Sequence, residues 1–253
     1  MGKRAGLLDE VRGIAYISMV IYHLYFDIAF VYGTDLPYVV DIIMKWFQPL
    51  IAGTFIFVAG ISSNYSSDNF KRGTKYFFLA MILTFVTSAV MPSEVIVFGV
   101  LHFLGISALI YGFIGKFTEK IPCIVGMIVF ILLYAVTLNV PLGYMGFEGI
   151  FTLRLPTALY EPKLLFPLGF PSRDFFSGDY FPLIPHFFLF LAGASYGTRL
   201  KAGRAAKGIY MTRFNSLAFI GRHGLWIYML HQPVIMVILE LIYKLLGQRT
   251  VFL

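Results

Sequence analysis

The sequence predicts an all-α integral membrane protein, with about seven transmembrane helices in a single domain that covers residues 1–253. Composition gives the first observation: 58% of the residues are hydrophobic and 13% are charged, whereas a soluble domain carries about a quarter charged residues. The second observation is that the apolar residues are grouped into runs long enough to cross a hydrocarbon core of ~30 Å.

Seven such runs follow one another along the chain. They comprise residues 13–32, 46–63, 76–91, 95–114, 121–139, 181–197 and 225–246. The third and sixth runs are short, and residues 214–220 can form a half-helix before the last span. Small residues in the second run predict close helix packing: Ala52, Gly53, Ala59, Gly60, Ser62 and Ser63.

The distribution of basic residues predicts the orientation. With the N-terminus in the cytoplasm, fourteen of the 20 Lys and Arg residues lie at or near loops on that side and six lie on the other. Cytoplasmic loops carry the excess of Lys and Arg in membrane proteins. We therefore predict a cytoplasmic N-terminus and a C-terminus outside. A net charge of +7 distributed in this way does not indicate nucleic-acid binding.

The only long connection, residues 140–180, joins the fifth and sixth predicted spans on the outer side. Its five prolines break regular helix. It is expected to form either a lid or partly re-entrant loop next to the substrate entrance, or an interfacial loop whose Phe and Tyr side chains lie at the lipid headgroups.

The strongest candidate site is His23 with Asp27, inside the first apolar run. Residues at i and i+4 share one helix face, and His23 lies about 15 Å beyond Gly13, near the middle of the bilayer. Asp27 is expected to fix the tautomer of the imidazole and to stabilise its protonated form. A general base or an acyl-accepting histidine needs such a partner.

Three further histidines lie in or at the edge of predicted spans. His102, in the phrase FGVLHF, is a candidate for a second acid or base. For His186 and His231 we favour a simple hydrogen bond to a neighbouring helix.

A second group consists of cationic residues on the predicted cytoplasmic side. Arg12, Arg72 and the pair formed by Arg222 and His223 are candidates to bind an anion such as a phosphate. The alternative is that they serve membrane orientation alone.

Other classes of site are disfavoured. A single cysteine, Cys123, and the lack of Cys/His spacing patterns argue against a structural zinc site, and no metal is expected. No two histidines are spaced along one helix to ligate two haems. A proton-coupled transporter that uses the His/Asp pair as a proton relay stays an alternative, although no inverted repeat or pair of broken helices is visible.

Five motifs carry a family resemblance. The chain reads LDEVRGIAYISMVIYH at residues 8–23, FIFVAGISS at 55–63, FGVLHF at 98–103, DYFPLIPHF at 179–187 and IGRHGLWIYMLHQPV at 220–234. In order and spacing they resemble small bacterial relatives of heparan-α-glucosaminide N-acetyltransferase, within the wider group of transmembrane acyltransferases that includes the acyltransferase-3 type.

The resemblance implies transfer of an acetyl group from cytoplasmic acetyl-CoA to an amine or hydroxyl group, often of a sugar or glycan, on the far side of the membrane. Arg12 matches the arginine of the first helix and His23 the histidine at its end. His23 is expected either to deprotonate the acceptor or to carry the acetyl group, with His102 assisting. Arg12, Arg72 and Arg222 are expected to hold the phosphates of CoA.

Acceptor binding is assigned to Asp179, at the outer mouth, and to His186, which stands where the relatives often have an aromatic residue. The expected location is a bacterial cytoplasmic membrane, in contact with lipid. Helix faces rich in Gly, Ala and Phe also permit a homodimer.

Overall fold

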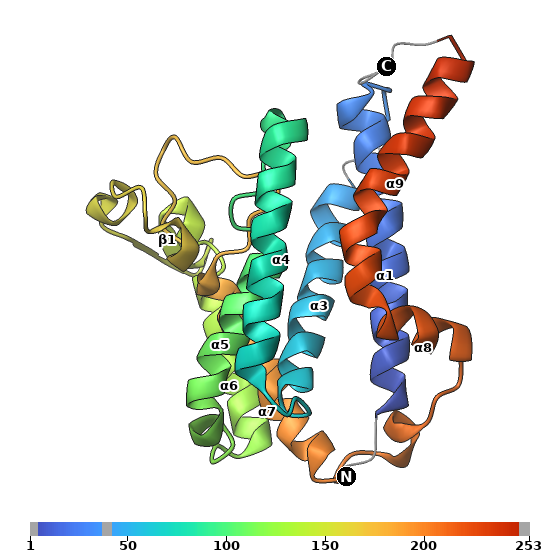
Figure 1. Ribbon diagram of the computed structural model, residues 1–253. Helices are drawn as coiled ribbons and strands as arrows, with labels where there is room; N and C mark the ends of the chain where they lie inside the picture. The colour runs from blue at the N-terminus through green and yellow to red at the C-terminus, as the bar shows by residue number, and fades with distance from the viewer. Residues whose placement is uncertain (1–4, 37–41, 248–253) are drawn as a thin grey trace. The chain divides into compact units, whose positions relative to one another are not determined.

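The computed structural model describes residues 5–36 and 42–247, and most of them are helical (Figure 1). The chain is divided into two compact units. Within the described residues, unit 1 consists of the chain up to Phe55 and from Ala205 onward, and unit 2 consists of Ile56–Arg204.

Unit 1 is built around the first and last helices of the chain. Helix α1 (Gly6–Phe26) continues into a π-helical turn, η1 (Asp27–Val31), and runs beside α9 (Gly224–Leu245). The unit also contains the π-helical turn η2 (Ile43–Phe47), the first half of α3 (Gln48–Ser63), the 3-10 turn η7 (Lys207–Tyr210) and α8 (Asn215–Arg222). The half-helix predicted at residues 214–220 is thus confirmed as α8.

Close backbone contact joins α8 to α1. A Cβ atom on Gly13 would lie 2.1 Å from the carbonyl oxygen of Leu217, and one on Gly221 would lie 1.9 Å from that of Asp9. Glu10 is 3% exposed, and its carboxylate accepts the backbone N–H of Phe214 at 2.9 Å. Only glycine permits this approach, so the short helix is fixed against α1.

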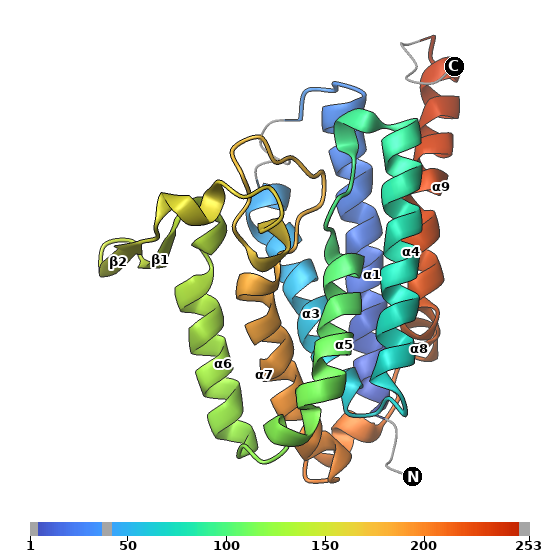
Figure 2. The same ribbon diagram turned by 60° about the vertical axis from the view of Figure 1, so that its left-hand side comes forward.

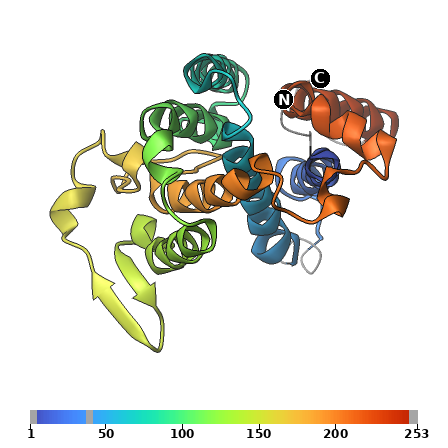
Figure 3. The same ribbon diagram turned by 90° about the horizontal axis from the view of Figure 1, so that it is seen from below.

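Unit 2 is a helical bundle made of α4 (Asn69–Val90), α5 (Val100–Thr118), α6 (Cys123–Thr137), α7 (Leu183–Lys201) and the end of α3. Figure 2 shows α4 beside α5 and α6 beside α7, and Figure 3 shows the bundle end on. A Cβ on Gly60 would lie 2.0 Å from the carbonyl oxygen of Phe190. The packing role predicted for the small residues of the second span is therefore confirmed for Gly60.

The long connection between α6 and α7 holds no α-helix. It contains the 3-10 turns η4 (Val140–Leu142), η5 (Thr157–Tyr160) and η6 (Phe166–Leu168) and a hairpin of β1 (Tyr144–Phe147) with β2 (Phe151–Arg154). The strands are antiparallel, with Tyr144 opposite Arg154, and the hairpin projects from the bundle (Figure 2). The prolines break helix as predicted, but the hairpin departs from a purely α-helical fold.

Six described helices are long and apolar enough to cross a membrane. They comprise Gly6–Val31, Lys45–Ser63, Asn69–Val90, Val100–Thr118, Cys123–Leu142 and Gly224–Leu245. Their outer faces carry uncovered apolar side chains, such as Phe85 and Phe113 at 73% and 71% exposure, as lipid contact requires. The chain is a multi-pass membrane protein.

Several of the predicted spans differ from the observed helices. The first and third were predicted from residues 13 and 76, whereas α1 begins at Gly6 and α4 at Asn69. The sixth span, predicted at residues 181–197, overlaps α7, which has 19 residues but is not among the six helices that are long and apolar enough to cross a membrane. The fourth was predicted from Val95, whereas α5 begins at Val100 because the preceding residues bond to the distant segment 177–181: Gly178 N–H donates to the Val95 carbonyl and Phe181 N–H to that of Phe98.

Candidate active site

In unit 1, polar side chains join α1 to α9 at the end of α1. Asp27, the first residue of η1, is fully buried, and Gln232 of α9 donates from Nε2 to both of its carboxylate oxygens at 2.9 Å. One turn further, Tyr32 donates to Glu240 Oε2 at 2.6 Å. The π-helical turn that ends this helix therefore begins at the buried carboxylate.

His23 lies one turn before Asp27, in the last turn of α1, and its ring packs against the ring of His231. The two ring centroids are 4.7 Å apart and the planes are tilted by 58°. His231 Nδ1 lies 2.7 Å from the Tyr228 carbonyl oxygen. The cluster in unit 1 thus contains two histidines, not one, together with Asp27 and Gln232.

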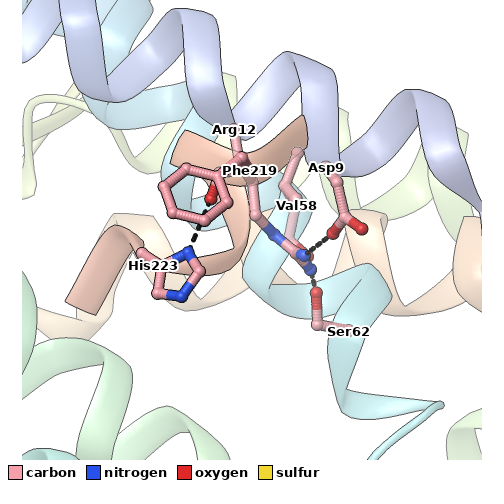
Figure 4. A network of polar contacts seen from close by, with 6 residues as sticks. All are labelled: Asp9, Arg12, Val58, Ser62, Phe219 and His223. Atoms are coloured by element: carbon pink, nitrogen blue, oxygen red, sulfur yellow. Dashed lines mark hydrogen bonds and ion pairs between the residues drawn. The ribbon is translucent and has the colours of Figure 1, made fainter. Parts of the chain in front are cut away.

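The two arginines of unit 1 that the sequence singled out, Arg12 and Arg222, lie toward the opposite end of α1. Arg12 Nη1 forms an ion pair with Asp9 Oδ1 at 2.8 Å, and His223 Nδ1 donates to the Phe219 carbonyl at 2.9 Å (Figure 4). Arg222 is exposed at the end of α8, directly after Gly221, whose backbone lies on that of Asp9. Arg12 and Arg222 therefore extend from backbones that are in contact.

In unit 2, His102 and Asp179 both bond to the start of α5. His102 Nδ1 accepts the Gly99 N–H at 3.3 Å, so its Nε2 carries the proton and donates to Thr84 Oγ1 at 3.1 Å. Asp179 Oδ2 accepts the Val100 N–H at 2.9 Å, which satisfies a helix N-terminus whose N-cap residue, Gly99, has no side chain.

Removal from water raises the pKa of Asp179 to about 6, and the hydrogen bond from the Val100 N–H opposes this rise. Burial disfavours the charged form, whereas a donor to the carboxylate favours it. The carboxyl group therefore titrates closer to neutrality than an ordinary aspartate.

The other two predicted residues of unit 2 have separate surroundings. Arg72 Nη2 donates to Ser63 Oγ at 2.5 Å and so bridges the end of α3 and the start of α4. His186 Nδ1 donates to the Pro182 carbonyl at 2.9 Å, and its ring lies among those of Phe103, Tyr134 and Phe181.

The structure thus assembles the predicted residues into groups. In unit 1, one polar cluster contains His23 and Asp27, and Arg12 and Arg222 extend from the contacting helices α1 and α8. In unit 2, His102 and Asp179 share the start of α5, whereas Arg72 and His186 bond to other partners. His231 and Gln232 were not predicted as members of the cluster. The available signal was the polar pair directly before a proline in the last apolar run.

These features define a class: a multi-pass helical membrane protein with histidine and carboxylate groups buried between apolar helices. The comparison with family models specifies it further. The family described as heparan-alpha-glucosaminide N-acetyltransferase, catalytic, matches residues 4–233, and the chain belongs to this family of membrane acyltransferases. No curated protein and no solved structure matches the chain. Family membership implies acetyl-CoA as co-substrate and a glycan-type acceptor.

Proposed function

We propose that the chain transfers an acetyl group from cytoplasmic acetyl-CoA to an amine or hydroxyl group of a sugar or glycan on the opposite side of the membrane. The observation that carries this proposal is the polar cluster of His23, Asp27, His231 and Gln232 between two apolar helices. An ionisable group at the centre of a bilayer costs roughly 2.5–3.5 kcal/mol on insertion scales, so such groups are maintained where they have a function.

The proposed arrangement has seven spans, with α7 as the seventh, and a cytoplasmic N-terminus in a bacterial cytoplasmic membrane. Helix α7 has 19 residues, which at 1.5 Å per residue extend about 28 Å, close to the core thickness. The connection between α6 and α7 then lies outside. The family match includes residues of both units, which supports a single catalytic domain.

Arg12 and Arg222 are proposed to bind the phosphates of CoA near the cytoplasmic surface, with Arg72 as a further cation. Guanidinium groups are suited to phosphate because they donate paired hydrogen bonds. His23 follows Arg12 by eleven positions of the same helix, a rise of about 16 Å. A thioester on a long, thin arm can cover this distance while the charged nucleotide stays outside the apolar core.

His23 is the proposed catalytic residue, in one of two schemes. In the first, His23 accepts the proton of the acceptor amine or hydroxyl as that group attacks the thioester carbon; the carbon–sulfur bond breaks and the proton passes to the sulfur. In the second, a nitrogen of His23 attacks the thioester carbon, the N–H proton leaves with the sulfur, and the acetyl group then passes to the acceptor, whose proton returns to the imidazole.

The residues of unit 2 keep the roles that the sequence predicted. His102 is proposed as a second acid or base, and Asp179 and His186 as acceptor-binding residues. Both ring nitrogens of His102 have hydrogen-bond partners. The hydrogen bond from its Nε2 to Thr84 would therefore have to break before Nε2 could contact a reacting group.

The test is acetyl transfer from radiolabelled acetyl-CoA to glucosamine by the purified protein in vesicles. We expect His23→Gln to abolish transfer while CoA still raises the melting temperature as it does for the wild type. The matched control is Ile21→Val, in the same helix with a side chain 44% exposed, which should retain activity. Full turnover by His23→Gln would remove His23 from the mechanism, and no transfer by the wild type to glucosamine, N-acetylglucosamine or glucose would refute the proposed function.

A further inference from the structure

His231 is held in one tautomer by its own helix. Its Nδ1 lies 2.7 Å from the Tyr228 carbonyl oxygen, and because a carbonyl oxygen can only accept, Nδ1 must carry the proton. In a neutral imidazole the other nitrogen, Nε2, then has a lone pair and no proton. His231 is therefore a fixed hydrogen-bond acceptor.

This acceptor has no partner within the described part of the chain. His231 Nε2 is buried, and no hydrogen bond reaches it. Buried polar atoms are nearly always paired, and each exception in a folded protein calls for an explanation such as a catalytic role or a bound group. The neighbouring Gln232 supplies a second such acceptor, Oε1, while its Nε2 is engaged by Asp27.

The ring in contact with His231 is that of His23, with the centroids 4.7 Å apart. Among the described residues, no hydrogen bond engages the ring nitrogens of His23. The χ2 torsion of histidine is soft, so a small rotation of either ring brings an N–H of His23 to the bare nitrogen of His231. The bonds between Gln232 and Asp27 fix the register of the two helices at this level.

We infer that His231 is a positioning residue for His23: its Nε2 accepts an N–H of His23, so that the other nitrogen of His23 presents a lone pair to the reacting group. The inference rests on the proposed function, and it assigns to His231 the orienting role that the sequence had assigned to Asp27. Asp27 then acts indirectly, because it holds Gln232 and thereby the part of α9 that carries His231.

The step balances without a further reactant. The acceptor oxygen or nitrogen attacks the thioester carbon, a carbon–oxygen or carbon–nitrogen bond forms, and the carbon–sulfur bond breaks. The acceptor proton moves to the free nitrogen of His23 and then to the sulfur of CoA. His231 stays neutral and stabilises the transient imidazolium by accepting its second N–H.

The activity test compares two substitutions at one position. His231→Phe keeps an aromatic ring without an acceptor, and His231→Gln offers an amide oxygen near the position of Nε2. With acetyl-CoA and glucosamine, we expect His231→Phe to lower kcat by about 10²-fold with KM for acetyl-CoA unchanged, and His231→Gln to recover about tenfold of that loss. The control is Leu230→Phe, which adds a ring on the side of α9 that is 54% exposed and should leave kcat unchanged.

A spectroscopic measurement tests the pairing independently of turnover. In protein labelled with ¹⁵N-histidine, we expect a strongly deshielded imidazole proton that disappears in both His23→Phe and His231→Phe. Its absence from the wild type, or an unchanged kcat for His231→Phe, would overturn the inference. If that proton is present while the wild type transfers no acetyl group, the pairing stands and the proposed function fails.

Discussion

Asp179 allows a direct test of how burial affects its carboxyl group, because one substitution removes the negative charge and keeps a hydrogen-bond acceptor. Asp179→Asn removes the charge and keeps an oxygen that can accept the Val100 N–H. The wild-type carboxyl has a pKa of about 6 in the folded protein and 3.8 unperturbed. A difference of about two pKa units corresponds to about 3 kcal/mol.

The direction of the pH effect on stability follows from how many protons the folded and unfolded states bind. Between pH 3.8 and about 6 the folded state retains the proton of Asp179 and the unfolded state has released it, so the free energy of unfolding decreases as the pH rises through this range. Below it both states are protonated, and above it both are ionised, so the contribution is constant. The neutral side chain of Asp179→Asn contributes no such slope.

The assay is the melting temperature of wild type, Asp179→Asn and Asp179→Ala in detergent between pH 4 and pH 8. We subtract the melting temperature of the wild type from that of Asp179→Asn at each pH. We expect this difference to increase by roughly 5–10 °C from pH 4 to pH 8. Asp179→Ala should be less stable than Asp179→Asn by about 1 kcal/mol at every pH, because the Val100 N–H loses its acceptor. Parallel pH profiles for wild type and Asp179→Asn would refute the reasoning.

Three further predictions follow from the contacts. Arg12→Ala should weaken CoA binding by about tenfold, measured by isothermal titration; an unchanged affinity would mean that Arg12 serves orientation alone. Gly60→Ala should cost about 1–3 kcal/mol because its Cβ would lie 2.0 Å from the Phe190 carbonyl oxygen, and a melting temperature equal to wild type would contradict that contact. Asp27→Asn should lower kcat for glucosamine acetylation by about tenfold through loosened bonds to Gln232, whereas an unaltered rate would show that Asp27 does not hold the cluster.

The sequence predicted the helices of this fold well because their signal is local. Apolar runs determine where α1, α6 and α9 lie, and residues 214–220 predicted the half-helix α8. The start of α5 was placed too early at Val95 because it depends on hydrogen bonds to residues about 80 positions away, such as the one from Val97 N–H to Ser177 Oγ. No window of sequence reports such a contact.

In the candidate site, too, the residues marked by local sequence were predicted, and those defined by distant contacts were not. His23 and Asp27 stood out because both are ionisable and lie one turn apart in an apolar run. His231 did not, since its significance depends on a ring packed against it from a helix near the other end of the chain and on a tautomer set by the Tyr228 carbonyl. The hairpin of β1 with β2 was missed because the prolines and aromatic residues of that segment indicated only an irregular loop.

The bond from Gln232 to Asp27 spans 205 positions of the chain, and this separation has a consequence for biosynthesis. At ribosomal speeds of about 5–20 residues per second, α9 emerges roughly 10–40 s after α1. Throughout that interval the Asp27 carboxylate lacks the hydrogen bonds from Gln232, and the insertion machinery or water in the bilayer must solvate it. Truncated chains that end before α9 should therefore leave α1 poorly anchored and open to quality-control proteases.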